Sequence, residues 1–359
     1  MKPFNPIEHI VIIVKENHTF DNYFGTFPGA NGDATLQHAP DPPASDPPHD
    51  HAAWLRRATG AVRQQYHEAD IPAYFSYARQ FTLCDNFFSE IASQSEPNHL
   101  ILIAADSPII DNSSAHRTYQ PQEPFDLPSL PASLAQAGLT WKSYGDPTFN
   151  YFDHIVALKG SKQIVAWTEF DAEAAAGKLP NVCWVYAPSQ FSEHPPFGSD
   201  AGTPVVTTGM QWTAERISSI ARSSQWSSTA VFLTWDDWGG WYDHAEPELK
   251  DTWKNGGPSS GPSYTGTQFS YGPRVPCMVL SPYARKGHIS KAFHSHVSLV
   301  RFCETTFGLA PLTPRDAASD DMADCFDFEQ TPLPPPVLPV PAPKPPKKHR
   351  KRHHKPAKK

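Results

Sequence analysis

Two short acidic segments each follow a pattern typical of a buried strand. Glu16 and Asn17 come shortly after the apolar run IVIIV, and Asp236 and Asp237 come directly after the run AVFLTW. Ligands bind beyond the carboxyl ends of the strands in open parallel sheets, so neighbouring strands would bring these side chains together. Three carboxylates and an amide oxygen repel one another unless a cation neutralises them, and oxygen donors suit a hard divalent metal. The pattern predicts a divalent metal site; a turn and a helix cap are the alternatives for either segment alone.

A serine near a predicted helix start could supply a nucleophile. Ser95 lies two residues before Pro97, which fits the first position of a helix that opens there. A helix start offers N–H groups and a partial positive charge, which favour a phosphate. A hydroxyl beside a metal–carboxylate cluster can act as a covalent nucleophile. A capping role is the alternative, and for Ser95 taken alone it is the more common one.

Seventeen histidines provide candidates for proton transfer. His194 lies in the rigid loop Ser-Glu-His-Pro-Pro, and His244 closes the segment Asp-Asp-Trp-Gly-Gly-Trp-Tyr-Asp-His. His49 and His51 sit in a long Pro/Asp/His-rich loop that could fold over a pocket. His296 begins the last predicted helix, where capping or packing is at least as good an explanation as catalysis.

The elements that must position these residues alternate between strands and helices. Such alternation favours a mostly parallel sheet covered by helices on both faces. Apolar, β-branched runs predict strands, and helical periodicity predicts helices between them. The expected strands are 10–14, 139–144, 182–186, 230–235 and 275–280, and the expected helices are 71–81, one opening at Pro97, 127–137, 211–222 and 296–307.

Charge is distributed unevenly along the 359 residues. The net charge is −7, yet residues 344–359 hold nine Lys or Arg and no acid, so the rest of the chain is strongly acidic. An acidic body argues against specific nucleic-acid binding, because a phosphate backbone attracts positive surface. We expect residues 331–359, which are Pro-rich and then basic, to form a disordered tail that could contact an anionic surface.

The five cysteines include no Cys-x-x-Cys pair, so neither a zinc ribbon nor a dense disulfide framework is indicated. The longest apolar runs are too short to cross a bilayer. No secretory signal is visible before the first strand-like run, which leaves the localisation open.

Several motifs together resemble the bacterial phosphoesterase family that contains phosphatidylcholine-type phospholipases C and an acid phosphatase, a branch of the alkaline-phosphatase superfamily. The resemblance implies a three-layer α/β/α sandwich over residues 1–330 and hydrolysis of phosphate esters. The motifs occur in family order; they are KENHTFDNYFG within 7–25, the stretch 71–88, SEPNH at 95–99, SEHPP at 192–196, TWDDWGGWYDH at 234–244, and the stretch 274–283.

The resemblance also implies roles for individual residues. Glu16, Asn17, Asp236 and Asp237 match metal-binding positions, and Ser95 matches the nucleophile, where the phospholipases usually carry Thr. The implied reaction is attack by Ser95 on phosphorus, giving a phosphoserine that water hydrolyses. The metal, a divalent ion of unspecified identity, would act as Lewis acid and template.

Histidines complete the expected site. His194 and His244 are expected to protonate the leaving group or bind phosphate, and His51 and His99 to bind substrate. Where the family commonly has Arg, this chain has His18 and His99. Both replacements weaken the expected binding of phosphate, or restrict that binding to conditions in which histidine is protonated.

The leading hypothesis is a metal-dependent phospholipase C-type enzyme acting on a phospholipid. A broad acid phosphomonoesterase acting on small phosphate esters is the alternative, and a non-catalytic protein that binds anionic surfaces is a third reading. Aromatic residues near the second acidic segment could cage a quaternary ammonium group or could pack in the core. These aromatic residues are Trp235, Trp238, Trp241 and Tyr242.

Overall fold

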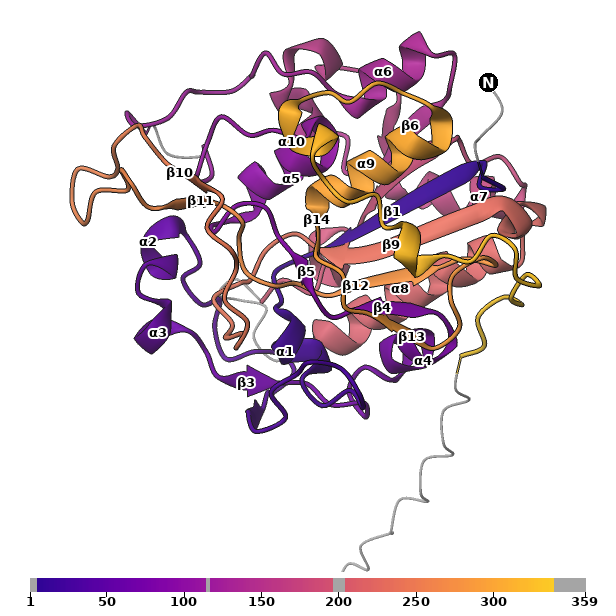
Figure 1. Ribbon diagram of the computed structural model, residues 1–359, viewed down its shortest axis with the longest axis horizontal. Coiled ribbons are helices and arrows are strands. Elements are labelled where there is room, and N and C mark those ends of the chain that lie inside the picture. The colour runs from indigo at the N-terminus through magenta and orange to yellow at the C-terminus, as the bar shows by residue number, and fades with distance from the viewer. Residues whose placement is uncertain (1–4, 114–116, 196–203, 339–359) are drawn as a thin grey trace, which may run out of the picture.

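An eight-stranded sheet forms the centre of the protein (Figure 1). The structure is a computed structural model, and it describes residues 5–113, 117–195 and 204–338. In sheet order the strands are β13 (His288–Ser290), β4 (Thr82–Cys84), β12 (Cys277–Leu280), β9 (Thr229–Trp235), β1 (His9–Lys15), β8 (Val182–Tyr186), β6 (Trp141–Gly145) and β7 (Ile164–Ala166).

The sheet is mostly parallel, as the alternating pattern predicts. β1 runs parallel to both β8 and β9, and β6 runs parallel to both β7 and β8. β12 is the exception, because it is antiparallel to β9 and to β4. The expected α/β class with a mostly parallel sheet is confirmed.

Helices cover both faces of this sheet. One layer contains α5 (Ser95–Ala104), α6 (Leu130–Gln136), α9 (His296–Phe307) and α10 (Pro314–Ala317), in which α5 packs on α9 and α6 and α9 packs on α10 (Figure 1). The other layer contains α4 (Pro72–Gln80), α7 (Phe170–Ala175) and α8 (Val206–Ala221), in which α8 contacts both of its neighbours. The chain is therefore a three-layer α/β/α sandwich.

No helix among the described residues has the length and apolar character needed to span a membrane.

Shorter elements lie in the loops around the sheet. The remaining helices and strands are α1 (Phe20–Phe24), α2 (His51–Trp54), α3 (Arg57–Gly60), β2 (Gln37–His38), β3 (Gln64–Gln65), β5 (Phe87–Phe88), β10 (Asp251–Thr252), β11 (Gln268–Ser270) and β14 (His294–Ser295). The 3-10 turns are η1 (Tyr151–His154), η2 (Val156–Leu158), η3 (Trp167–Glu169), η4 (Ser189–Phe191), η6 (Ser224–Ser228) and η7 (Ala323–Cys325).

Several element boundaries differ from those expected; helix α8, for example, begins at Val206 and not at Gln211. Helix α5 begins at Ser95, so Pro97 is its third residue and not its first. Strand β12 begins at Cys277, because Pro276 has no N–H to donate to a ladder. The strands β4, β7 and β13 were not predicted, since three residues each are too few to show a periodicity.

The first residues of the expected tail pack against the body of the protein. The N–H of Leu333 donates to the carbonyl of Pro282 at 2.7 Å, and Val337 exchanges hydrogen bonds of 2.9 and 2.8 Å with the Gln80 side chain. Residues 331–338 therefore contact the body of the protein, through the carbonyl of Pro282 and the side chain of Gln80. The basic part of the tail lies outside the described residues.

A buried carboxyl pair predicts how stability depends on pH. Glu304 on α9 is fully buried, and burial together with the neighbouring Asp316 carboxylate raises the pKa of Glu304 to about 8. Asp316 accepts N–H bonds of 2.7 Å from Leu312 and Thr313, which hold it in the ionised form. A raised pKa in the folded state favours folding below pH 4.5, and this contribution is lost as the pH rises towards 8.

Glu304→Gln should therefore flatten the decline in stability between about pH 4.5 and 8. We expect the variant to be more stable than the parent at pH 9 by roughly 2 kcal/mol, because it cannot ionise beside Asp316. Urea unfolding at pH 5, 7 and 9 measures this difference. Equal losses of unfolding free energy in both proteins between pH 5 and 9 would contradict the assignment.

Candidate active site

The carboxyl ends of two central strands bring the acidic segments together. β1 and β9 are parallel neighbours in register, with Lys15 opposite Trp235, so the residues that follow them emerge side by side. The N–H of Asn17 donates to Asp236 Oδ1 at 3.0 Å, and the N–H of Asp236 donates to the carbonyl of Lys15 at 3.0 Å. Four side chains thus share one edge of the sheet; they are Glu16, Asn17, Asp236 and Asp237.

Two backbone features make this close approach possible. Asn17 has a φ of 63°, in the left-handed region that Asn tolerates better than most residues. Gly239 also has a positive φ of 57°, and a Cβ at this position would lie 2.4 Å from the carbonyl oxygen of Asn17. The segment after β9 can therefore pack directly on the segment after β1 only because residue 239 is glycine.

Ser95 projects from the start of α5 into the acidic group. Its Oγ lies 3.3 Å from Glu16 Oε2, 3.4 Å from Asn17 Oδ1 and 3.2 Å from Asp237 Oδ2. These distances are long for O–H···O hydrogen bonds, which are usually 2.5–3.0 Å. They match the separation of about 3.3 Å between adjacent oxygens around a cation bound at roughly 2.3 Å.

The helix start offers fewer N–H groups to a phosphate than the sequence indicated. The N–H of Glu96 donates to Asn112 Oδ1 at 2.8 Å, and Pro97 has no N–H. Binding of an anion by the start of α5 is therefore limited, and the contribution of Ser95 must come chiefly from its hydroxyl group.

His99 lies one turn after Ser95 and faces the carboxylates. Its Nε2 lies 3.3 Å from Asp236 Oδ2 and 3.5 Å from Glu16 Oε1, and its ring stacks on Tyr151 at 4.1 Å. Burial lowers the pKa of His99, but the two carboxylates outweigh it and raise the pKa to about 9. His99 is fully buried and contacts both carboxylates, and its predicted role in substrate binding stays a prediction.

His194 and His49 lie on the other side of Asn17. With the Asn17 amide oriented to satisfy its neighbours, its NH₂ donates to Glu16 and Asp236 at 3.0 Å each, and its oxygen accepts from His49 at 3.2 Å and His194 at 3.1 Å. In the opposite orientation the amide oxygen faces Ser95 and the carboxylates. That second orientation places several acceptor oxygens together and needs a cation among them.

These residues fit a hard divalent cation. Among the described residues, buried Asp236 Oδ2 has an ion-pair contact with His99 but no hydrogen bond, and the donor set consists of carboxylate, amide and hydroxyl oxygens. Glu16, His99 and Asp236 also place one ligand atom each within 4.8 Å of one another. Burial and the charge of Asp236 raise the pKa of Asp237 well above its usual value, so ionised Asp237 is unfavourable here. A positive charge nearby would stabilise its ionised form.

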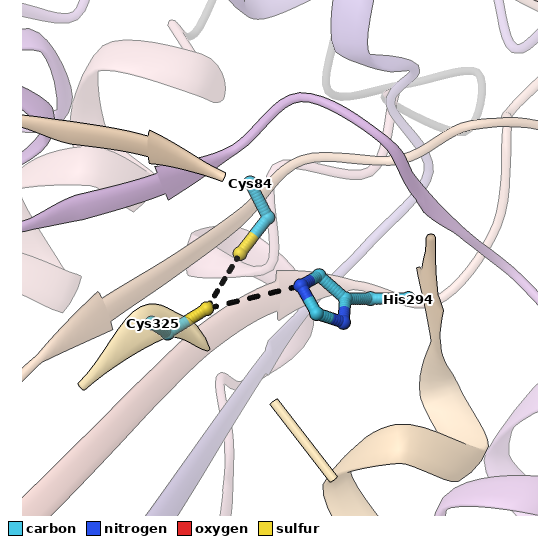
Figure 2. Close-up of side chains that lie close together, drawn as sticks. All are labelled: Cys84, His294 and Cys325. Atoms are coloured by element: carbon cyan, nitrogen blue, oxygen red, sulfur yellow. Dashed lines mark hydrogen bonds between the residues drawn. The ribbon is translucent and has the colours of Figure 1, made fainter. Parts of the chain in front are cut away.

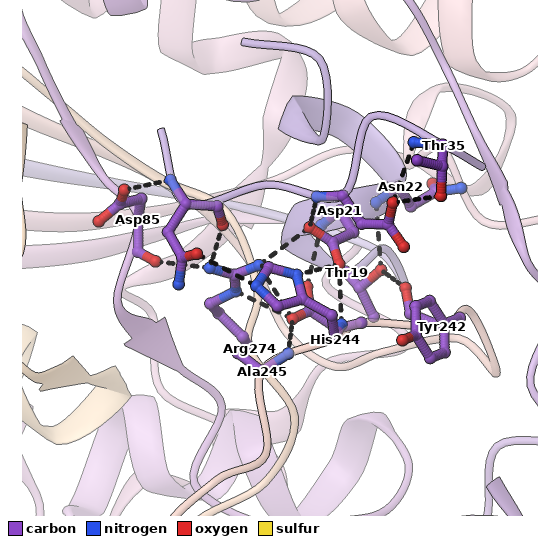
Figure 3. Close-up of polar contacts among 12 residues, drawn as sticks. Thr19, Asp21, Asn22, Thr35, Asp85, Tyr242, His244, Ala245 and Arg274 are labelled. Carbon is purple, nitrogen blue, oxygen red and sulfur yellow. Dashed lines mark hydrogen bonds and ion pairs between the residues drawn. The ribbon is translucent and has the colours of Figure 1, made fainter. Parts of the chain in front are cut away.

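His244 lies in a polar network around Asp21 and Arg274, and its predicted catalytic role stays a prediction (Figure 3). Its Nδ1 lies 2.7 Å from Asp21 Oδ2, and Arg274 binds Asp21 Oδ1 at 3.0 Å. Arg274 also donates to Asp243 Oδ1 at 3.0 Å. The left-handed glycines after Asp237 direct the chain towards Asp21, so His244 links the segment after β9 to helix α1.

His51 is also satisfied elsewhere. Its Nδ1 lies 2.9 Å from the carbonyl of Ala92 and its Nε2 lies 2.7 Å from Thr267 Oγ1, and the side chain is fully buried. Both ring nitrogens of His51 therefore have protein partners that fix the first long loop, and its predicted role in substrate binding stays a prediction. His296 is likewise buried, with Nε2 2.9 Å from the carbonyl of Trp235.

The aromatic residues near the second acidic segment pack in the interior. Trp235, Trp238 and Trp241 are at most 2% exposed, and the indole N–H of Trp238 donates to the carbonyl of His49 at 2.9 Å. The guanidinium of Arg63 lies 3.5 Å over the Tyr242 ring. Core packing accounts for the three tryptophans, while Trp238, Trp241 and Tyr242 also line a pocket beside Trp54.

Sequence reasoning did not identify Glu193, which anchors the loop that carries His194. Its buried carboxylate accepts hydrogen bonds from Tyr23 at 2.7 Å, Tyr74 at 2.5 Å and the Trp235 indole at 3.2 Å, and Lys15 pairs with it at 3.2 Å. The residue has a φ of 77°. A charged residue of ordinary appearance beside a histidine gives no sequence signal for such a network.

Glu193→Ala should destabilise the fold strongly. Removing the carboxylate leaves the Lys15 ammonium buried and unpaired, which costs about 3–5 kcal/mol. Glu215→Ala is the matched control, because its ion pair with Arg216 involves a carboxylate that is 70% exposed, and it should change stability by less than about 1 kcal/mol. Guanidinium unfolding measures both, and similar losses in the two variants would count against the anchoring role.

Sequence similarity connects the chain to a known family of proteins. A family model described as "Phosphoesterase family" matches residues 7–43 and 43–310. The non-hemolytic phospholipase C of Pseudomonas aeruginosa is 26% identical over 417 residues, covering 93% of this chain and 59% of that protein. Phospholipase C B of Mycobacterium tuberculosis is 25% identical, covering 91% and 79% respectively. The chain spans about 60% of the length of the first of these relatives.

The solved structures show the same fold at low sequence identity. Murine ectonucleotide pyrophosphatase/phosphodiesterase 5, in complex with AMP, superposes with a TM-score of 0.51 at 9% identity, covering 89% of this chain and 100% of that one. The human protein of the same name gives a TM-score of 0.51 at 8% identity, again covering 89% and 100%.

Proposed function

Because the chain belongs to the phosphoesterase family, we propose that it hydrolyses phosphate esters through a phosphoserine formed on Ser95, as a phospholipase C-type enzyme. The observation that carries this proposal is the position of Ser95 Oγ, within 3.4 Å of oxygens that follow both central strands. Relatives named as phospholipases C support a phospholipid substrate.

The first half-reaction would transfer the phosphoryl group to the protein. Ser95 Oγ attacks phosphorus in line with the leaving oxygen, the phosphorus–oxygen bond to the glycerol side breaks, and a phosphoserine diester remains. The hydroxyl proton of Ser95 passes to a neighbouring carboxylate, for which Asp237 Oδ2 at 3.2 Å is the nearest acceptor. We assign protonation of the leaving oxygen to His194, which is partly exposed beside Asn17.

The second half-reaction would restore the serine. Water attacks the phosphoserine, the bond between phosphorus and Ser95 Oγ breaks, and the phosphorylated headgroup leaves. Glu16, Asn17, Asp236 and Asp237 are the residues that would hold a divalent cation. Such a cation supplies positive charge that offsets the carboxylates and the phosphoryl oxygens.

A broad phosphomonoesterase is the second candidate, favoured by the packing of Trp235, Trp238 and Trp241 in the core. These three indole rings are at most 2% exposed, which leaves little aromatic surface to contact a choline group. Assays on phosphatidylcholine micelles and on p-nitrophenyl phosphate, each with Mg²⁺, Mn²⁺ or Ca²⁺, separate the candidates. We expect phosphocholine release from the diester to exceed phosphate release from the monoester at least ~10-fold in kcat/KM. The reverse order would assign a phosphomonoesterase, and no hydrolysis with any metal would support a binding protein.

A further inference from the structure

A second cluster of metal-ligating side chains is separate from the acidic group. Cys84 ends β4, His294 begins β14, and Asp324 and Cys325 belong to the turn η7. Figure 2 shows the two sulfur atoms and the imidazole ring pointing toward one another. Cys84, His294 and Cys325 are fully buried, whereas the Asp324 side chain is 37% exposed.

The spacing of these four groups fits a tetrahedral metal site. The sulfur atoms of Cys84 and Cys325 are 3.6 Å apart, and Cys325 Sγ lies 3.9 Å from His294 Nε2 and 3.8 Å from Asp324 Oδ1. His294 Nε2 lies 3.1 Å from the same carboxylate oxygen. Zinc bonds of 2.3 Å to sulfur and about 2.05 Å to nitrogen and oxygen predict separations of about 3.8 Å for S–S, 3.6 Å for S–N and 3.3 Å for N–O.

Neighbouring groups orient the histidine for this purpose. His294 Nδ1 lies 2.6 Å from Asp320 Oδ1, which leaves Nε2 directed into the cluster. Metal-binding histidines are commonly oriented in this way by a carboxylate on the other nitrogen. Ser290 Oγ lies 3.0 Å from Nε2 and donates to Asp324 Oδ2 at 2.5 Å, so it also braces the carboxylate.

We propose that Cys84, His294, Asp324 and Cys325 bind one zinc ion in a structural site distinct from the acidic group after β1 and β9. Sulfur and nitrogen ligands favour zinc, whereas the oxygen ligands around Ser95 favour a harder cation. Binding requires the two thiols and His294 Nε2 to release their protons to solvent. The ion would tie the segment around η7, which has little regular structure, to the end of β4.

Cobalt provides a readout specific for this site, because thiolate ligands give charge-transfer absorption that oxygen ligands do not. The full chain is reduced, stripped with a chelator and titrated with Co²⁺ and then Zn²⁺. We expect the band to saturate at about one equivalent of Co²⁺ and to disappear when Zn²⁺ displaces it. Cys84→Ala and Cys325→Ala should lose the band, whereas Cys183→Ala, which alters another buried thiol on β8, should keep it.

Measurements on the parent protein, without any variant, are enough to refute the proposal. Titration of the folded, reduced chain without a thiolate band would exclude the site, whether or not the variants fold. A thiol count on the unreduced, denatured protein tests the competing chemistry. Three reactive thiols out of five, with no bound zinc, would mean that two cysteines form a disulfide, and peptide mapping would show whether Cys84 pairs with Cys325 or with Cys277 opposite it on β12. Either disulfide would refute the metal site. Ester hydrolysis unaffected by loss of the band would leave the assignment of Ser95 intact.

Discussion

Ser95→Ala is expected to lower kcat for phosphate ester hydrolysis by at least ~1000-fold, because the variant has no oxygen to attack phosphorus. The side chain makes contacts of 3.2–3.4 Å only with the proposed metal-binding residues, so its removal should leave the fold unchanged. Steady-state kinetics with unchanged circular dichroism measure this effect. Acid-quenched parent enzyme should also carry a phosphoryl adduct on the peptide containing Ser95.

Two matched variants sharpen this prediction. Ser143→Ala removes a buried hydroxyl on β6 that has no hydrogen-bond partner among the described residues. This change should leave kcat within about twofold of the parent. Ser95→Thr retains a hydroxyl and should preserve measurable turnover. Full activity in Ser95→Ala would eliminate the phosphoserine mechanism.

Asp237→Asn should have opposite effects on the metal-free protein and on activity. One negative charge is removed from a buried group that also contains Glu16 and Asp236, so we expect the metal-free variant to melt a few degrees higher than the parent. The asparagine oxygen can still accept the 2.7 Å hydrogen bond from the N–H of Gly239. Cation affinity and kcat/KM should each fall at least ~100-fold.

Melting temperatures with and without Mn²⁺ test this prediction. The parent should gain about 2.7 kcal/mol of stability at 100 times the Kd, and Asp237→Asn should gain almost nothing at that concentration. Asp251→Asn makes the same change of charge at an exposed position on β10 and should respond as the parent does. An equal response to Mn²⁺ in Asp237→Asn would remove this residue from the metal site.

The part of the site that depends on strand order could be predicted from the sequence. β1 and β9 are buried on both faces and read as continuous apolar runs, so their positions were clear, and parallel pairing then fixed where Glu16 and Asp236 emerge. Ser95 could be placed near them because a helix start is visible in its motif. Its exact position within the helix could not, because Pro97 is also acceptable at the third helical residue.

The parts of the site that depend on loop conformation could not be predicted in this way. His244 is close in sequence to Asp237, yet two left-handed glycines redirect the chain so that Asp21 binds it. His49 reaches Asn17 from a long loop whose path no periodicity describes. The cluster around Cys84 is likewise invisible to motif spacing, since its ligands come from three distant segments.

The central claim is that Ser95 Oγ and the residues after β1 and β9 share one cation. Anomalous diffraction from a crystal soaked in Mn²⁺ tests it most directly. We predict one strong peak within about 2.5 Å of Ser95 Oγ and of oxygens from Glu16, Asp236 or Asp237. Full manganese occupancy elsewhere, with no peak between Ser95 and the acidic side chains, would contradict this account of the site.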